Sequence, residues 1–296
     1  MPLWKALLLS PYYEATLPLR WWNELRASAR GRVPLAVLCY HRIADDEATP
    51  WTISNRAFAR QIQWLRRHFE MISLEAVQQR IRAGTSDRPA VSVTFDDGYS
   101  ENCQHGIPLL VREKIPATCF VTARSVLRGV PFDHDVRYGR PAAPNTPEQL
   151  RAMAAGGIEI AAHTYSHPDL GPVTDTRLLH AELVDAREQL RNVLGCPIRY
   201  FAFPYGGRAN LSRRALDFAW AAGYEAACSC YGGYNLPGDD GFHLQRIPVD
   251  SSMLRLKNWV TGDPRKRNTP RFAWEPPALE KGDSPHLCEA ASGPFR

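Results

Sequence analysis

The sequence predicts an α/β barrel built around a parallel sheet of seven strands. Seven apolar runs with the length of β-strands recur along the chain, segments with helical spacing lie between most of them, and polar side chains follow several runs directly. Strands that alternate with helices form βαβ units and a parallel sheet. Seven such units are one fewer than the eight of the common (β/α) barrel. A doubly wound open sheet is the alternative.

The strands are predicted from short apolar or alternating runs bounded by polar residues. In the second run, Val91, Val93 and Phe95 alternate with Ser92 and Thr94, as the two faces of a strand require. The predicted strands cover residues 34–40, 90–95, 116–122, 158–163, 198–203, 224–230 and 242–249.

The helices are predicted from apolar residues at helical spacing and from end signals. Thr146 and Pro147 mark the start of one helix, and Gly195 marks the end of the most strongly periodic one. Pro108 is expected to break or kink another. The predicted helices cover residues 55–69, 73–84, 101–114, 146–157, 174–195 and 210–223.

Three regions follow from these elements. Residues 34–260 form the predicted catalytic domain, and residues 261–296, which are rich in proline and charge and poor in periodicity, are predicted to be a poorly ordered tail. Residues 1–33 are predicted to be a helical segment. Packing on the domain is the favoured interpretation, and contact with a membrane surface through its tryptophans and leucines is the alternative.

Composition narrows the class of protein. The net charge of +5 comes from scattered arginines without a basic block, so no nucleic-acid partner is expected. Ser10 and Pro11 end the first apolar run too early for a signal peptide or a membrane span. Seven dispersed cysteines without a C-x-x-C pair suit reduced thiols. We therefore expect a cytoplasmic protein, with the inner membrane face as an alternative; the oligomeric state is left open.

Polar side chains after the apolar runs predict a metal site. His163 and His167, four residues apart, follow one strand, and Asp96 and Asp97 follow another. In a parallel barrel, the carboxyl ends of the strands meet at one rim. Two histidines and one carboxylate suit Zn²⁺ or another divalent transition metal in a hydrolytic site. One metal needs only one aspartate, so the other is free to act as a base.

Other active-site patterns are absent from the sequence. No G-x-S-x-G elbow, P-loop or G-x-G-x-x-G motif follows any predicted strand. A serine nucleophile and a nucleotide cofactor are therefore not expected.

Three ordered motifs resemble those of the polysaccharide deacetylase family, also called the NodB homology or carbohydrate esterase 4 family. They are TFDDGYSEN (94–102), HTYSHPDL (163–170) and FAFPYGG (201–207), and the resemblance covers residues 34–250. It implies a distorted (β/α)₇ barrel and metal-dependent removal of acetyl groups from sugars.

The resemblance also implies site residues. Asp96 corresponds to the catalytic base, and Asp97, His163 and His167 correspond to the metal ligands. Residues 204–206 (Pro204, Tyr205 and Gly206) would line the acetyl site, with the Tyr205 N–H helping to hold the oxyanion. The expected cofactor is a divalent metal, Zn²⁺ first, with Co²⁺, Ni²⁺, Mn²⁺ and Fe²⁺ as alternatives.

Two features depart from the family pattern. Ala202 stands where many members carry the arginine that holds the catalytic aspartate, and we expect Arg246 to replace it; a purely structural arginine is the alternative. His243 does not fit the late histidine motif. The sequences YH, ending at His41, and FAFPYG are instead similar to the poly-N-acetylglucosamine deacetylase subgroup. This similarity implies that His41 is the general acid, with a loop cap as the alternative.

Asp133, His134 and Asp135 form a further polar cluster after the third strand. Substrate contacts on a long loop are the favoured interpretation, and a second metal site is the alternative.

The predicted function is hydrolysis of a non-peptide C–N bond. The resemblance implies removal of N-acetyl groups from a glycan that contains N-acetylglucosamine, with release of acetate. Alternatives are a hydrolase of small or cyclic amides with the same fold and a non-catalytic glycan-binding protein. Whether the glycan is a polymer or lipid-linked is left open.

Overall fold

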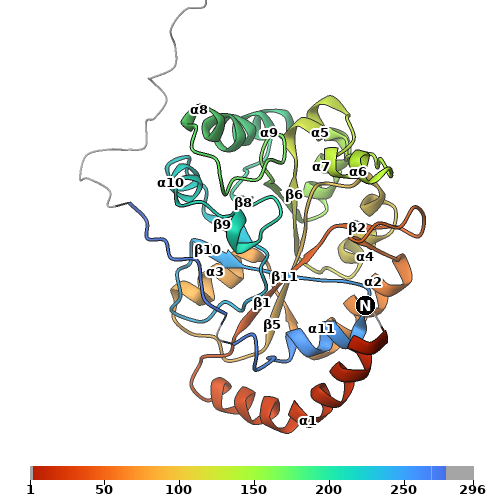
Figure 1. Ribbon diagram of the computed structural model, residues 1–296, viewed down its shortest axis with the longest axis vertical. Helices are drawn as coiled ribbons and strands as arrows, with labels where there is room; N and C mark the ends of the chain where they lie inside the picture. The colour runs from red at the N-terminus through yellow and green to blue at the C-terminus, as the bar shows by residue number, and fades with distance from the viewer. Residues whose placement is uncertain (1–2, 268, 278–296) are drawn as a thin grey trace, which may run out of the picture.

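A parallel β-sheet forms the centre of the computed structural model, which describes residues 3–267 and 269–277, with the side chains of residues 3–6 excepted (Figure 1). Its strands run in the order β10-β9-β8-β7-β6-β5-β1-β11, and every neighbouring pair is parallel. The last predicted strand is divided into β10 and β11 by a single residue, Arg246. β10 pairs with β9 and β11 with β1, so the sheet closes almost into a ring, as the predicted barrel requires.

The main strands coincide with the seven predicted runs. Two short additions are β4 (Glu70–Met71), which pairs with β5, and a two-stranded sheet of β2 (Arg42–Ile43) and β3 (Thr52–Ile53). The barrel strands are β1 (Leu35–Tyr40), β5 (Ala90–Phe95), β6 (Ala117–Val121), β7 (Ile158–Ala162), β8 (Tyr200–Ala202), β9 (Ala226–Ser229), β10 (His243–Gln245) and β11 (Ile247–Pro248).

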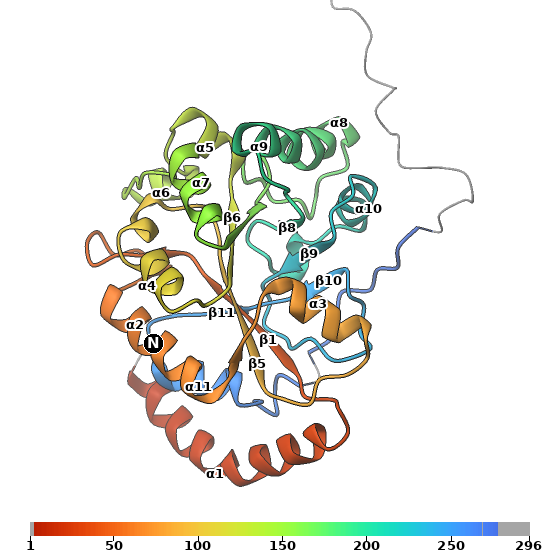
Figure 2. The ribbon, with the colours of Figure 1, turned by 180° about the vertical axis from the view of Figure 1, so that it is seen from behind.

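Helices cover the outside of the sheet in both views (Figures 1 and 2). The first ones are α1 (Leu3–Ser28), α2 (Asn55–His68), α3 (Leu74–Arg82), the 3₁₀ turn η1 (Ser100–Cys103), α4 (Gly106–Arg112), α5 (Ala123–Arg128), α6 (Asp133–Tyr138) and α7 (Pro147–Ala155). The later ones are α8 (Thr176–Leu179), the π-helical segment η2 (His180–Asp185), α9 (Ala186–Leu194), the 3₁₀ turn η3 (Arg208–Asn210), α10 (Arg213–Ala221) and α11 (Met253–Val260).

The core has two parts because both faces of a parallel barrel are covered. Leu35 and Val37 of β1 belong to one buried cluster, whereas Ala36 and Leu38 of the same strand belong to the other. All six residues of β1 and all six of β5 are buried. This explains why their sequences are almost continuously apolar.

The helical predictions need four corrections. The predicted helix over residues 101–114 is divided at His105 into η1 and α4. Pro108 lies in the first turn of α4, where its missing N–H costs no helical hydrogen bond. The predicted helix over residues 174–195 contains a π-helical segment in its middle. The predicted long loop after the third strand contains α5 and α6, and α11 was not predicted. These missed helices have only six to eight residues, too few to show a period.

The chain stays packed on the domain beyond residue 261. Trp274 is only 8% exposed, belongs to the main core cluster and donates its indole N–H to Asp217 Oδ1 (2.8 Å). Arg271 forms an ion pair with Asp239 (2.8 Å). The described part of the predicted tail is therefore ordered against the barrel, whereas the prediction for residues 278–296 lies outside the described residues.

The N-terminal segment is helical from residue 3 to residue 28 although Pro11 and Pro18 lie inside it. Figures 1 and 2 show α1 as an arc on the outside of the barrel beside α11. No helix in the described part of the chain combines the length and apolar character that a bilayer crossing needs.

Candidate active site

The predicted site residues gather at the carboxyl ends of the strands. Asp96 and Asp97 directly follow β5, His163 follows β7, and His41 follows β1. Tyr205 lies in the loop that follows β8. This is the rim at which a parallel barrel places its reactive groups.

Asp97, His163 and His167 converge on one point. Asp97 Oδ1 lies 3.6 Å from His163 Nε2 and 3.3 Å from His167 Nε2. One potential ligand atom from each residue lies within 4.8 Å of those of the other two. Asp97 and His163 are buried, and His167 is the most accessible of the three.

The protonation pattern of this cluster fits a divalent metal. Asp97 Oδ1 is buried and accepts no hydrogen bond from the described residues. His163 donates from Nδ1 to the Ala202 carbonyl (2.8 Å), so its Nε2 lone pair faces Asp97. Burial lowers the pKa of His163 to about 4, which keeps the ring neutral. Two imidazole nitrogens and one carboxylate oxygen are a donor set that Zn²⁺ accepts.

Asp97 is ionised despite its burial. Burial alone raises the pKa of an aspartate, but the close approach of the His167 ring, with smaller contributions from His134 and His41, lowers the pKa of Asp97 below its ordinary value. A cation bound between Asp97 and the two histidines would satisfy the carboxylate oxygen that has no donor.

Backbone strain is concentrated at this rim. Asp97, Thr164, His167 and Tyr205 all have φ between 63° and 69°, in the left-handed region. They are four of the six non-glycine residues with positive φ in the described chain. Such conformations cost about 1–3 kcal/mol each and persist where the surrounding structure imposes them. Three of the four, Asp97, His167 and Tyr205, are predicted site residues.

Asp96 meets different partners from its neighbour. The Arg246 guanidinium donates from Nη1 to Asp96 Oδ1 (2.6 Å) and from Nη2 to Oδ2 (2.8 Å). Arg246 is completely buried and also donates to Thr94 Oγ1 and to the Ser229 carbonyl. Burial raises the pKa of Asp96, but the charges of Arg246 and His163 and the Arg246 hydrogen bonds leave that pKa lowered.

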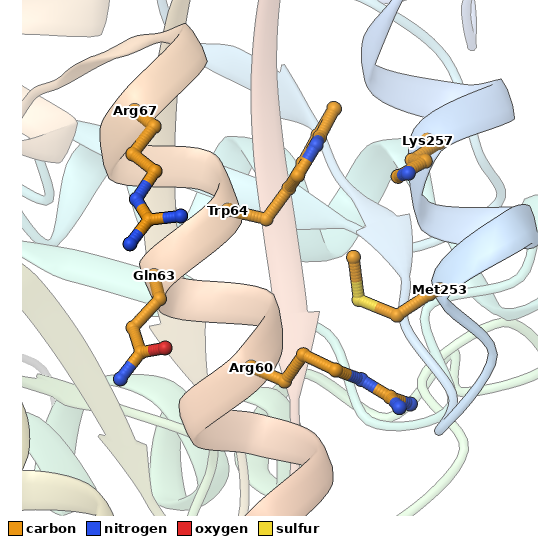
Figure 3. A pocket seen from close by; sticks show the side chains of 6 residues that line it. All are labelled: Arg60, Gln63, Trp64, Arg67, Met253 and Lys257. Carbon is orange, nitrogen blue, oxygen red and sulfur yellow. The ribbon is translucent and has the colours of Figure 1, made fainter.

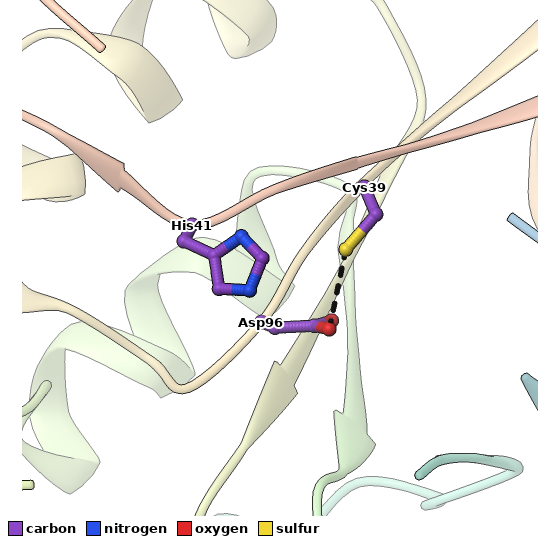
Figure 4. A group of neighbouring side chains, drawn as sticks. All are labelled: Cys39, His41 and Asp96. Atoms are coloured by element: carbon purple, nitrogen blue, oxygen red, sulfur yellow. Dashed lines mark hydrogen bonds between the residues drawn. The ribbon is translucent and has the colours of Figure 1, made fainter. Parts of the chain in front are cut away.

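His41 and Cys39 point toward the same carboxylate (Figure 4). Cys39 donates its thiol hydrogen to Asp96 Oδ2 (3.2 Å), and one ring nitrogen of His41 lies within 4.8 Å of both groups. The three side chains form a second cluster with metal-ligand chemistry. We assign the metal to the Asp97 cluster because the cationic Arg246 already engages both oxygens of Asp96.

The loop over residues 204–206 turns sharply beside His167. The rings of Tyr205 and His167 are 5.1 Å apart, and the Tyr205 side chain is 53% exposed. The Tyr205 N–H donates no hydrogen bond to any described residue. Gly206 must be a glycine here, since a Cβ would lie 2.6 Å from Cys230 Cβ and φ is 62°.

The cluster over residues 133–135 divides its side chains among different partners. His134 Nε2 lies 3.6 Å from Asp97 Oδ2 and is hydrogen bonded to the Tyr99 hydroxyl (2.9 Å). Asp133 pairs with Arg124 (2.5 Å), and Asp135 accepts from the Trp51 indole (3.1 Å). Only His134 approaches the Asp97 cluster. It also lines a cleft of about 280 Å³ that His167 and Tyr205 share.

Glu182 of η2, which no sequence motif indicated, supports the candidate metal cluster. This buried glutamate accepts from the N–H groups of Tyr165 (2.9 Å) and Ser166 (2.8 Å) and from the Ser166 hydroxyl (2.5 Å). It therefore fixes the loop between His163 and His167. The available signal was an acidic residue beside the apolar face of a predicted helix. His243, in contrast, is buried and hydrogen bonded to Ser229 Oγ (2.9 Å).

Comparisons with known proteins agree with this geometry. Residues 83–227 match the model of the polysaccharide deacetylase family. YxkH of Bacillus subtilis is 24% identical over 221 residues, covering 74% of this chain and 72% of that protein. A chitooligosaccharide deacetylase of a Bradyrhizobium species is 32% identical over 141 residues, but the match covers only 46% of this chain and 55% of that protein.

A solved structure has the same fold over most of the chain. IcaB from Ammonifex degensii superposes with a TM-score of 0.65 at 25% identity, covering 77% of this chain and 97% of IcaB. The family match includes all three members of the Asp97 cluster together with Asp96 and Tyr205. On these matches, with the fold and the rim geometry, residues 83–227 are identified as a domain of the polysaccharide deacetylase family.

Proposed function

We propose that the protein is a metal-dependent hydrolase that removes N-acetyl groups from a glycan containing N-acetylglucosamine and releases acetate. The observation that carries the proposal is the difference between two adjacent carboxylates. Asp97 faces two histidines with an oxygen that has no hydrogen-bond donor among the described residues, whereas Asp96 is held by both terminal nitrogens of Arg246.

Asp97, His163 and His167 would hold the metal, with Zn²⁺ as the first candidate. When bound, the ion supplies Lewis-acid chemistry, which polarises the acetamide carbonyl and makes water more acidic. The Ala202 carbonyl and Glu182 support this work by fixing the His163 ring and the loop that carries His167.

Asp96 is the proposed base. Its lowered pKa keeps the carboxylate ionised at neutral pH, ready to accept a proton from the attacking water. Arg246 orients the carboxylate with two parallel hydrogen bonds, a geometry that lysine cannot reproduce. Arg246 would thereby take over the task of the arginine that Ala202 replaces in the third motif.

Tyr205 and His41 are assigned to the remaining steps. The free N–H of Tyr205 can donate to the oxyanion that develops on the carbonyl. His41, beside Asp96, would give a proton to the departing nitrogen as the C–N bond breaks. Water supplies the oxygen that leaves in acetate, and the sugar keeps a free amine.

The acetylated sugar is proposed on two grounds. The chitooligosaccharide deacetylase relative is named for such a substrate, and the cleft beside His167 is lined by polar and aromatic side chains, including Arg124, Phe132 and Tyr205.

A substrate screen tests the proposal. Acetate release is measured on N-acetylglucosamine oligomers with β-1,4 and β-1,6 linkages, alongside small cyclic amides, with and without added Zn²⁺ or Co²⁺. We expect release from an oligomer that a chelator abolishes and metal restores. Turnover of the cyclic amides alone would replace the proposed substrate class. Oligomer binding without turnover under any metal would favour a glycan-binding protein.

A further inference from the structure

Helix α1 presents an apolar surface to solvent. Twelve residues of α1 from Leu7 onward are exposed, and all of them except Glu14 and Arg26 are apolar. Seven of the twelve large hydrophobic side chains that are exposed in the described chain belong to this helix. These seven, which we call the α1 face, are Leu7, Leu8, Leu17, Leu19, Trp21, Trp22 and Leu25.

The opposite side of α1 is polar and faces the protein. Tyr12, Thr16, Arg20 and Glu24 follow one another at four-residue spacing, which places them on one side of a helix. Arg20 is only 3% exposed. Its guanidinium donates to the backbone carbonyl oxygen of Asn258 (2.7 Å) and to Asn258 Oδ1 (2.6 Å). The Tyr12 hydroxyl donates to Asp263 (2.8 Å), whose Oδ2 accepts from the Asn258 amide (2.7 Å).

The polarity of α1 is therefore the reverse of that of an ordinary surface helix, which buries its apolar stripe against the core. Buried hydrogen bonds, made by polar side chains, fix the helix with the α1 face turned outward. A continuous exposed apolar surface of this kind marks an interaction site.

Basic residues lie at one end of the α1 face. Arg26, Arg30 and Arg32 are exposed around the C-terminal end of α1, and Glu14, in the first half of the helix, is the only exposed acidic residue among residues 7–28. On the other side of α11, a groove of about 330 Å³ is lined by Arg60, Arg67 and Lys257 together with Gln63, Trp64 and Met253 (Figure 3). No acidic side chain lines this groove.

We propose that the α1 face lies in the surface of an anionic lipid bilayer, parallel to its plane. Leucine and tryptophan on one side of a helix, with arginines at the margin, are the features of interfacial helices. The basic charge around α1 is complementary to anionic headgroups. The inference does not depend on the proposed chemistry, because no residue of the α1 face belongs to the active site.

Vesicle co-sedimentation of the full chain tests this proposal. The probes are vesicles of phosphatidylcholine alone and of phosphatidylcholine mixed with phosphatidylglycerol. We expect binding to the mixed vesicles and an at least tenfold weaker partition for the double variant Trp21→Gln, Trp22→Gln, because about this loss follows from removing two large apolar side chains. The matched control, Val111→Gln with Leu178→Gln, changes exposed apolar residues elsewhere and should bind like the wild type.

A charge variant makes the test independent of the tryptophans. Arg26→Gln with Arg30→Gln should weaken binding to the mixed vesicles by about thirtyfold, the effect of two basic residues near an anionic surface. Quenching of wild-type tryptophan fluorescence by lipids brominated in the acyl chain reports insertion without any substitution. Absence of both sedimentation and quenching, or binding that neither pair of substitutions weakens, would overturn the proposal. A dimer in light scattering that the tryptophan substitutions dissociate would assign the α1 face to a second copy instead.

Discussion

Asp96 and Asp97 are adjacent in the chain, yet their carboxylates meet different partners. Asp97 has φ of 69°, which turns its side chain toward His163 and His167, while Asp96 continues the direction of β5 toward Arg246. Adjacent like charges ordinarily raise one another's pKa. Here Arg246 beside Asp96 and the histidines beside Asp97 lower the pKa of both carboxylates, as the proposed base and the proposed metal ligand require.

Substitution of Arg246 tests how Asp96 is held. Arg246→Lys keeps the positive charge but loses the paired hydrogen bonds, so we expect acetate release to fall by about 10²-fold or more while the metal content stays unchanged. Parallel metal analysis and acetate assays measure both quantities. Arg199→Lys, in a partly exposed ion pair with Glu159, is the control. Wild-type turnover by the Arg246 variant would leave Arg246 as a structural residue only.

The candidate site residues that could be predicted from the sequence are those that directly follow a strand. Asp96, Asp97 and His163 each follow an apolar run, and a parallel barrel brings such positions to one rim. Glu182 and Cys39 were not found, because their function depends on contacts that no local pattern encodes. Arg246 was expected as a partner of Asp96 only through a gap in a family motif, since 150 positions separate the two residues in the chain.

At the scale of elements, the π-helical segment η2 supports the candidate metal site. The wider turn places Glu182 under the loop that joins His163 to His167, and π-helical turns occur frequently at functional sites. The sequence predicted one regular helix here, because a single inserted residue hardly disturbs the apolar period.

Weakening this support should loosen the metal site. Glu182→Gln removes the negative charge of the carboxylate that accepts hydrogen bonds from two backbone N–H groups. We expect the affinity for Zn²⁺ to fall by about 10- to 100-fold. Competition with a chromophoric chelator measures that affinity. Glu188→Gln, an exposed position on α9, is the matched control. Equal Zn²⁺ affinity in both variants and the wild type would show that η2 has no influence on the site.

Residues 269–277 behave as an element of the barrel although they form no helix or strand. Trp274→Ala removes a buried side chain from the core, and we expect the free energy of unfolding to fall by about 3 kcal/mol. Trp21→Ala, at a position 65% exposed, should change the free energy of unfolding by less than about 0.5 kcal/mol. Urea unfolding measures both variants, and equal stabilities would contradict the observed packing.

For the whole molecule, barrel closure depends on the split of the last strand into β10 and β11. Pairing with β9 ends at Gln245, and pairing with β1 begins at Ile247. The residue between them, Arg246, points toward Asp96. The alternation of strands and helices predicted the barrel. The split could not be predicted, because the mixed run over residues 242–249 gives no sign that it pairs with two different strands.

Closure also buries His243, which makes stability depend on pH. Burial, with smaller contributions from Arg271 and Arg208, lowers the pKa of His243 to about 3. Below about pH 6.5 the unfolded chain binds a proton that the folded chain excludes, so the stabilising contribution present above that pH declines as the pH falls toward 3.

His243→Gln should remove this share of the pH dependence. Between pH 7 and pH 5 we expect the wild type to lose about 2 kcal/mol more stability than the variant, as follows from a pKa difference of this size. Urea unfolding at both pH values measures the loss, and His105→Gln, at an exposed position, should follow the wild type. Parallel losses in wild type and His243→Gln would assign the pH dependence to other groups.

The division of labour between the two aspartates is tested most directly by measuring Zn²⁺ content and acetate release together on Asp96→Asn and Asp97→Asn. We expect Asp96→Asn to bind Zn²⁺ like the wild type but to release acetate about 10²- to 10⁴-fold more slowly, since it lacks the base. Asp97→Asn should lose both properties. Acetate release at the wild-type rate by Asp96→Asn, or full Zn²⁺ content in Asp97→Asn, would contradict this division of labour.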